Sequence, residues 1–386
     1  MIPVLIFTPR FLIDFTLKSL IFQWIYCFLK ILWYNEQNFS DEGTRNMWNY
    51  LKETRRPIVL YGMGNGADKI LDEMERRGIA ASGVFASDGF ARHNLFRGFE
   101  VVSYSEAKER FGEMTVLVTF GTQREDVMAL IEKVASENET FIPDVPVVGE
   151  GIFDKEYAAS HAAELRAVYD MLADEESKAT FRHLVDYKLS GRPESLRRAR
   201  SPREAMWDIL SLGANETYLD LGAYTGDTAL EFSHRVEGYE AILCVEPDGR
   251  NFRRLRENTA QLRNCECYNV GIADTVGEMT FSAGKGRGNA RGGKETVVRC
   301  ETVDHLLRGR AVSYIKMDVE GQERAAICGG AETIRRCRPK MLISAYHRTE
   351  DLFAIPLQVK EICPDYRVYL RHHPYIPAWD INYYFL

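Results

Sequence analysis

The stretch YLDLGAYTGDTALEF, residues 218–232, constrains the fold of this chain more than any other feature. A short apolar run ends in Asp220, Gly222 and Gly226 follow, and apolar residues then recur at helical spacing. The pattern predicts a buried parallel strand, a tight turn and a helix. Such a turn lies at the carboxyl edge of an open α/β sheet, where these folds bind ligands.

Further apolar runs between residues 205 and 386 repeat this alternation. The first five expected strands alternate with helices or crossover loops, which predicts a parallel sheet. The last two are separated by a short proline-rich loop and predict a hairpin at the sheet edge. The expected strands are residues 217–221, 241–245, 266–270, 312–317, 340–345, 366–370 and 381–386.

An earlier glycine turn predicts a second α/β unit, a Rossmann-like domain over residues 47–150. Gly62 and Gly64 begin a G-x-G-x-x-[G/A] pattern after an apolar run, and Asp88 stands roughly where a ribose-binding acid would lie. The turn either binds a nucleotide or serves only the tight connection. Helical periodicity over residues 151–204 indicates a helical connector between the two domains that a chain of this length predicts.

Residues 1–46 form an apolar N-terminal segment that differs from the rest of the chain. Residues 19–34 are apolar apart from Gln23 and Lys30, which is short for a membrane span of ~20 apolar residues. The segment is an interfacial membrane helix, a transmembrane anchor, or translated upstream sequence with the true start at Met47. We otherwise expect a cytoplasmic protein, membrane-associated only through this segment.

Composition narrows the classes of protein further. The formal net charge of -7 disfavours a broad nucleic-acid-binding surface. The eight cysteines include no C-x-x-C, and the closest pair, Cys265 and Cys267, lies on one expected strand. We therefore expect reduced, mostly buried thiols, with no disulfide framework and no metal site.

The residues around the second glycine turn favour one ligand. Gly222 lets backbone approach it, Gly226 permits the turn into the helix, and the free N–H groups of the helix start can bind a carboxylate. Asp220 can face an ammonium or a sulfonium, and Glu246 at the tip of the next strand can accept both ribose hydroxyls. A ligand with a ribose, a cation and a carboxylate fits S-adenosylmethionine better than a dinucleotide.

Four motifs carry a resemblance that covers the chain from Asp220 to the C-terminus. DLGAYTGDTALEF, CVEPDGRNFRRLREN, ETVDHLL and YIKMDVEGQE, in that order, resemble the signature of the FkbM-type family of S-adenosylmethionine-dependent methyltransferases. The resemblance implies a class I fold with a seven-stranded sheet, and O-methylation of a hydroxyl on a sugar, glycan or natural product. Tyr224 stands where many members have a smaller or amide residue. The cofactor contacts expected from these motifs are Asp220, Gly222, Ala223, Tyr224, Gly226, Asp227, Thr228 and Glu246, with Asp274 of the stretch GIAD near the adenine.

The chemical step is expected to depend on Asp318 and His347, at the tips of the fourth and fifth strands. His347 has a suitable unperturbed pKa, near 6.5, to accept the proton of an alcohol. Asp318 could orient the imidazole or the acceptor hydroxyl, hold a metal, or only cap the next helix. His372 and His373 lie after the sixth strand and are the next candidates.

Two alternatives remain open at this point. A nucleic-acid methyltransferase of the same fold is disfavoured because residues 318–321 read Asp-Val-Glu-Gly, without the [D/N]-P-P-aromatic clamp of base amino methylation. The other is a non-catalytic nucleotide-sugar or cofactor-binding protein that uses the first glycine turn. The acceptor is expected to be a small molecule or carbohydrate, and the basic glycine-rich residues 284–294 are either a substrate lid or a solvated hairpin tip.

Overall fold

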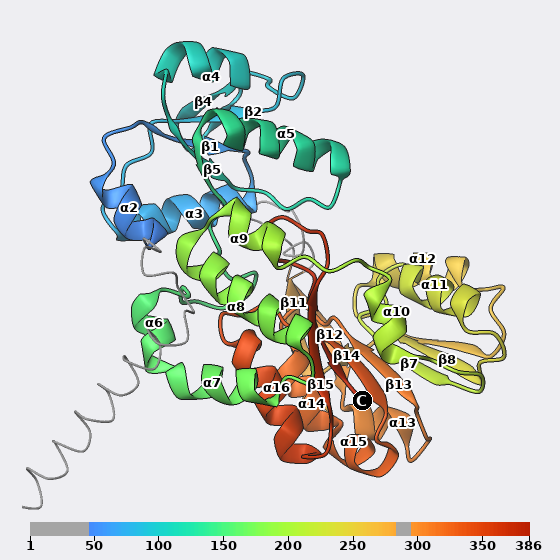
Figure 1. Ribbon diagram of the computed structural model, residues 1–386. Helices are drawn as coiled ribbons and strands as arrows, with labels where there is room; N and C mark the ends of the chain where they lie inside the picture. The colour runs from blue at the N-terminus through green and yellow to red at the C-terminus, as the bar shows by residue number, and fades with distance from the viewer. Residues whose placement is uncertain (1–45, 283–294) are drawn as a thin grey trace, which may run out of the picture.

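A computed structural model describes residues 46–282 and 295–386 of the chain (Figure 1). The apolar N-terminal segment, apart from Asn46, and the glycine-rich residues 284–294 lie outside the described residues. Within the part that is described, no helix is long and apolar enough to cross a membrane.

The N-terminal domain is a six-stranded sheet in the order β3-β4-β2-β1-β5-β6, parallel except for β3. Its central strands are apolar throughout and fully buried, which is typical of a parallel sheet covered on both faces. The strands at the first glycine turn form as expected, whereas β3, β4 and β6 were not predicted. The elements are α2 (Met47–Glu53), β1 (Ile58–Tyr61), α3 (Asn65–Arg76), β2 (Gly83–Ala86), β3 (Leu95–Phe96), β4 (Phe99–Ser103), α4 (Tyr104–Phe111), β5 (Thr115–Val118), α5 (Glu125–Glu137) and β6 (Glu139–Phe141).

The helices expected as a connector cover an edge of the second sheet. The Ser177 hydroxyl accepts a hydrogen bond from the Leu370 N–H at 2.9 Å, and the Ala173 N–H donates to the Val368 carbonyl at 2.8 Å. These bonds tie the start of α8 to the edge strand β15 (Val368–His372), and Figure 1 shows α8 in green near this strand. The connector helices are α6 (Lys155–Ser160), α7 (Ala162–Met171), α8 (Glu175–Ser190) and α9 (Pro193–Arg198), and α10 (Ala205–Leu210) begins the C-terminal domain.

The C-terminal domain is a seven-stranded sheet in the order β15-β16-β14-β13-β7-β8-β9. All neighbours pair in parallel except β16, which is antiparallel to both β14 and β15. The expected mostly parallel sheet is confirmed, and the final hairpin places its second strand inside the edge. The strands are β7 (Thr217–Leu221), β8 (Ala241–Val245), β9 (Cys265–Tyr268), β13 (Tyr314–Met317), β14 (Lys340–Ser344), β15 (Val368–His372) and β16 (Ile381–Phe385).

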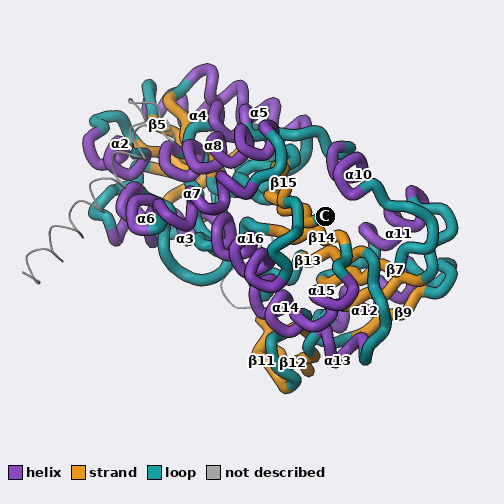
Figure 2. Tube along the Cα trace, turned by 60° about the horizontal axis from the view of Figure 1, so that its bottom comes forward, coloured by secondary structure: helices purple, strands orange, loops and turns teal. Residues whose placement is uncertain are grey.

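Helices cover both faces of this sheet because side chains alternate along each strand. One face packs against α10, α11 and α12, and the other against α14, α15 and α16. A small sheet of β10, β12 and β11 lies at the periphery of the domain (Figure 2). The remaining elements are α11 (Asp227–Arg235), α12 (Gly249–Asn258), β10 (Gly271–Ile272), β11 (Gly277–Ser282), β12 (Glu295–Glu301), α13 (Val303–Leu307), α14 (Glu323–Gly329), α15 (Ala331–Cys337) and α16 (Asp351–Ile362).

The two domains share one apolar core rather than meeting through a linker. A continuous cluster of buried side chains runs from the first sheet, through α7 and α8, to the second sheet. Backbone hydrogen bonds cross the same boundary, since Thr122 and Ile376 exchange N–H and carbonyl groups at 2.7 and 2.9 Å. Gly121 lies so close to Trp379 that a Cβ there would be 2.4 Å from the indole ring. The relative position of the domains is therefore fixed by packing.

Candidate active site

The turn after β7 is built around two glycines with left-handed backbone. Gly222 has a φ of +83°, and a Cβ at this residue would lie 1.9 Å from the Asp318 carbonyl oxygen. Gly226 has a φ of +88°, and its Cβ would lie 2.8 Å from Thr259. We expected Gly222 to make room for a ligand, but the space beside it is filled by the end of β13. The glycine therefore brings the cofactor turn and Asp318 together.

Asp220, at the end of β7, is fully buried and already has a cationic partner. Its carboxylate lies 3.1 Å from the Lys316 ammonium and accepts a hydrogen bond from the Thr228 hydroxyl. Burial alone would lower the pKa of Lys316, but the Asp220 and Asp318 carboxylates raise it, so Lys316 is charged. The expectation that Asp220 faces a cofactor cation does not agree with this geometry. Asp220 and Thr228 instead hold the turn and Lys316 in place.

Glu246 directly follows β8 and has a buried carboxylate that faces the same turn. Its two oxygens accept hydrogen bonds from the backbone N–H groups of Tyr224, at 3.0 Å, and Asp248, at 2.8 Å. Burial raises the pKa of Glu246 to about 7, against the lowering effect of these hydrogen bonds. Two carboxylate oxygens offer about four acceptor sites, so this group can take further donors such as ribose hydroxyls.

Other expected cofactor residues differ in their exposure. Ala223 is buried under the turn, whereas Tyr224 has a φ of +48° and its side chain is 54% exposed. Asp227 is exposed at the first position of α11, whose start has no side-chain cap. Asp274 is exposed beyond β10, which pairs with β12 of the small sheet. Because no side chain caps the start of α11, the N–H groups of its first turn are available to an anion.

A buried histidine lies among carboxylates at the tips of β13 and β14. His347 has no exposed surface, and its Nδ1 lies 3.0 Å from Glu323. Its Nε2 lies 3.5 Å from Asp318 and 3.6 Å from Glu320. Neither ring nitrogen has hydrogen-bond geometry to a partner, so these contacts are primarily electrostatic. The arrangement is that of an imidazolium surrounded by three carboxylates.

The charge state of His347 corrects its expected role. Burial alone would lower the pKa of His347, but the Glu323, Asp318 and Glu320 carboxylates raise it to about 10. A protonated imidazole at neutral pH cannot accept the proton of an alcohol. We therefore interpret His347 as a positioning residue rather than as the general base.

Asp318 is the carboxylate of this cluster that is best placed for chemistry. Its side chain is 28% exposed, against 1% for Glu323, and its Oδ1 accepts a hydrogen bond from the Tyr346 hydroxyl at 3.1 Å. Asp318, Glu323 and His347 also lie close enough to share a metal ion, with ligand atoms within 4.8 Å of one another. A metal ion bound there would displace the proton of His347, because an imidazole binds a metal in its neutral form.

The two other candidate histidines belong to the interior of the fold. His372 and His373 lie at the end of β15, which is separated from β13 by β16 and β14. Burial lowers the pKa of His372 to about 3. His373 bonds the Tyr384 hydroxyl at 2.8 Å and contacts the Ser201 carbonyl at 3.3 Å. Neither reaches the cluster around Asp318.

A loop of the N-terminal domain contacts this site, and the sequence did not reveal the contact. The Val148 N–H donates to the His347 carbonyl at 2.9 Å, and Val148 packs beside Gly321. Lys69 of α3 holds the same loop, donating to the Pro146 and Val147 carbonyls at 2.8 and 2.6 Å. Loop 146–148 therefore joins the first domain to the backbone of the catalytic cluster. The acids of DVEGQE were a visible signal for the cluster, but no motif marked this loop.

Comparison with solved structures identifies the fold. A methyltransferase FkbM from Methylobacillus flagellatus KT superposes with a TM-score of 0.68, over 86% of this chain and 90% of that one, at 19% identity. The shared region includes much of the N-terminal domain, because the match exceeds the C-terminal domain alone. Together with the strand order, this likeness shows a class I methyltransferase fold.

Sequence comparison shows what the C-terminal domain is similar to. Residues 220–377 match the methyltransferase FkbM domain. The 2-O-methyltransferase NoeI of Sinorhizobium fredii (strain NBRC 101917 / NGR234) is 26% identical, over 38% of this chain and 70% of the relative. The family expected from the four motifs is therefore confirmed.

Proposed function

We propose that this methyltransferase transfers the methyl group of S-adenosylmethionine to a hydroxyl of a sugar, glycan or natural product. One observation carries the proposal: the Asp318 carbonyl fills the space beside Gly222, so a partly exposed carboxylate adjoins the cofactor turn. The relative named as a 2-O-methyltransferase supports oxygen as the acceptor atom.

The residues around the turn fit S-adenosylmethionine. Glu246 presents a buried carboxylate for ribose hydroxyls, and the uncapped N–H groups of α11 can hold the carboxylate of the cofactor. Tyr224, exposed beside Glu246, can pack on the adenosine portion. When bound, the cofactor supplies an electrophilic methyl group on a sulfonium.

The chain's own groups can then position and deprotonate the acceptor. An alcohol is a poor nucleophile until its proton begins to leave, so a carboxylate within hydrogen-bond reach both orients it and takes the proton. Asp318 has this role in our proposal, with Tyr346 and the His347 imidazolium fixing its orientation. The three carboxylates around one imidazolium leave an excess of negative charge, which also favours a cationic donor nearby.

The first glycine turn favours a structural role over nucleotide binding. A Cβ at Gly62 would lie 2.4 Å from the Phe120 ring, and one at Gly66 would lie 2.1 Å from the Thr119 carbonyl. The expected ribose-binding acid, Asp88, accepts hydrogen bonds from the Tyr104 N–H and the Ser105 hydroxyl at the start of α4. We therefore propose that the N-terminal domain serves the catalytic site through loop 146–148.

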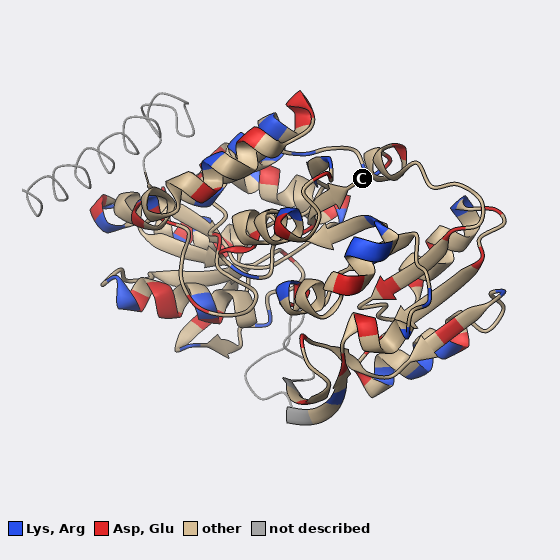
Figure 3. Cartoon of the chain, turned by 90° about the horizontal axis from the view of Figure 1, so that it is seen from below, with Lys and Arg blue, Asp and Glu red and all other residues tan. Residues whose placement is uncertain are grey.

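A small-molecule or carbohydrate acceptor is proposed rather than a nucleic acid. The chain carries a net charge of -7, and Figure 3 shows basic and acidic residues interspersed along the described elements in that view. Phosphate backbones need a continuous basic surface for affinity.

The test is single-turnover transfer of labelled methyl to a panel of hydroxylated sugars and glycans. Asp318→Asn should lower the transfer rate by ~10²–10⁴-fold, because it removes the proton acceptor, while binding of S-adenosylhomocysteine stays near wild type. Asp365→Asn is the matched control, at an exposed carboxylate in the turn before β15. Near-wild-type transfer by Asp318→Asn would remove this residue from the mechanism. Loss of transfer with chelator and recovery with magnesium would replace proton acceptance by a metal-assisted step, and absence of cofactor binding would end the proposal.

A further inference from the structure

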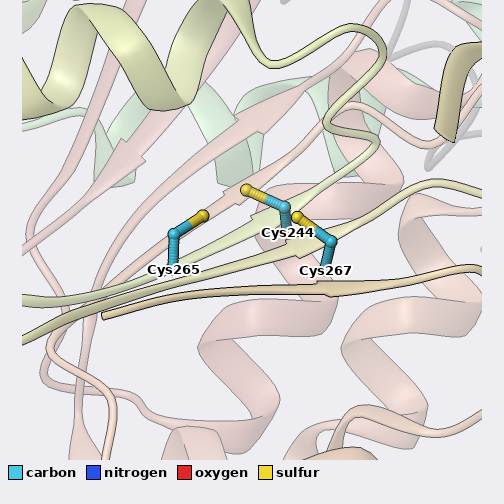
Figure 4. A group of neighbouring side chains, drawn as sticks. All are labelled: Cys244, Cys265 and Cys267. Carbon is cyan, nitrogen blue, oxygen red and sulfur yellow. The ribbon is translucent and has the colours of Figure 1, made fainter. Parts of the chain in front are cut away.

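Three cysteines from two neighbouring strands meet beneath the cofactor turn. Cys244 lies on β8, and Cys265 and Cys267 lie on β9, with Cys244 directly opposite Cys267 in the parallel register. Residues two apart on a strand point to the same face, so all three side chains project from one face of the sheet. Their sulfur atoms lie within 4.8 Å of one another and turn toward a common point (Figure 4).

We propose that these three thiols bind one thiophilic metal ion, of the class that includes Zn²⁺, Cu⁺ and Cd²⁺. Soft thiolate ligands select such ions over Mg²⁺ and Ca²⁺, which prefer oxygen. No carboxylate or imidazole belongs to the group. Among the described residues, this is the one candidate metal cluster made of sulfur alone.

The spacing of the sulfur atoms suits a shared ion. A metal–sulfur bond of about 2.3 Å places three sulfurs around one metal about 4 Å apart, whether planar or tetrahedral. The observed upper limit of 4.8 Å is within 1 Å of that value, a difference that side-chain rotation can close. The ligands therefore need no change in strand register to bind.

The surroundings of the cluster allow a metal ion to enter. Cys244 is fully buried in the apolar cluster under α12, whereas Cys265 and Cys267 on the edge strand are partly exposed. Binding replaces the thiol protons by the metal and releases them to solvent.

Packing alone explains this cluster less well than a shared ligand does. A buried cysteine commonly acts as a small apolar side chain, and the isolated thiols Cys300 and Cys363 fit that description. Cys265 and Cys267 instead place two sulfurs on one face of an edge strand, where larger apolar residues would cover α12 more fully. The Thr259 hydroxyl, 3.6 Å from the Cys267 sulfur, adds a polar group beside them.

The experiment titrates the reduced full-length protein with Cd²⁺ and follows thiolate-to-cadmium charge-transfer absorption in the ultraviolet. We expect one ion per chain with an absorption amplitude of three thiolates. Cys265→Ala and Cys267→Ala should each weaken binding by about 100-fold or more, because such affinity depends on the complete ligand set. A Cys27→Ser, Cys328→Ser double variant, which leaves the cluster intact, should bind as the wild type does.

Circular dichroism and thermal unfolding establish that each variant is folded. The two alanine substitutions are at partly exposed positions, where they disturb the packing less than a change at the buried Cys244 would. Unchanged binding in a folded Cys265→Ala variant would overturn the proposal. So would loss of binding in the control variant. Formation of a disulfide within the cluster under mild oxidant, with no cadmium binding by the reduced protein, would assign the thiols to redox chemistry instead.

Discussion

The buried charge of His347 gives a prediction that depends on the sign of its pKa change. In the folded protein the carboxylates around it raise its pKa from 6.5 to about 10. A group with a raised folded pKa stabilises the fold fully below its unfolded pKa, and this contribution is lost as pH rises through the folded pKa. His347 should therefore stabilise the protein at neutral pH and progressively less in alkali.

The size of the effect follows from the same two values. At pH 7 the contribution is about 4 kcal/mol, and more than half of it is lost by pH 9. Asp351 and Glu246, both with pKa raised to about 7 by burial, are about half ionised at pH 7 and titrate further as the pH rises to 9, in the wild type and in a variant alike. Thiols and tyrosines also titrate at alkaline pH, but they do so in the wild type and in a His347 variant alike. Their contributions therefore cancel from the difference in unfolding free energy between the two proteins.

The perturbation is His347→Gln, which keeps a polar side chain of similar size and removes the charge. Loss of one partner from a buried ion pair typically costs ~3–5 kcal/mol. The variant should thus be less stable than the wild type at pH 7, and the gap should narrow by about 2 kcal/mol by pH 9. His305→Gln is the matched control, because His305 pairs with Glu301 at a half-exposed position.

Urea unfolding at pH 7, 8 and 9 measures the stability gap, and NMR of histidine-labelled protein measures the protonation directly. The resonance absent from the His347→Gln spectrum should show no titration between pH 6 and 8.5. A midpoint near 6.5 for that resonance, or a stability gap independent of pH, would refute the charged imidazole and restore His347 as a candidate base.

Two further predictions concern the cofactor turn and the start of the fold. Glu246→Ala should weaken S-adenosylmethionine binding by ~1.5–3 kcal/mol in calorimetry, because charge-assisted hydrogen bonds to ribose are lost. Glu278→Ala, at an exposed residue of the small sheet, is the control. Equal affinities of the wild type and both variants would contradict the assignment of Glu246. A chain beginning at residue 44 should fold and bind cofactor, and one beginning at Met47 should be about 1 kcal/mol less stable because the Asn46 side chain caps α2. Thermal unfolding compares the two, and aggregation of both while the full chain behaves well in detergent would instead favour a membrane anchor.

The sequence predicted the C-terminal sheet well because each strand is an apolar run with a turn at its end. β7 and β8 form over the expected residues, since their side chains are almost all buried and no alternative periodicity competes. The short strands β3 and β6 were missed because two or three residues carry too little pattern. The order of the two final strands depends on which of them pairs with β14. No local sequence pattern specifies that β16 does so rather than β15.

The site was predicted in its residue types but not in its charges. Asp220 and Lys316 lie on adjacent strands, and only the register of β7 with β13 reveals that they neutralise each other. His347 seemed a suitable base at its ordinary pKa, and the three carboxylates that change this come from a separate turn. The cysteine cluster likewise required the pairing of β8 with β9, because a separation of 21 residues between Cys244 and Cys265 matches no ligand motif.

Loop 146–148 has a consequence for how such chains can be recombined. Because Val148 bonds the backbone of His347 and Lys69 bonds the loop, the segment is shared by both domains. An exchange of C-terminal domains between relatives at a boundary near residue 204 would separate the His347 cluster from the loop that bonds its backbone. Chimeras that carry the loop together with α3 keep these contacts, so the exchange is best made with both domains together.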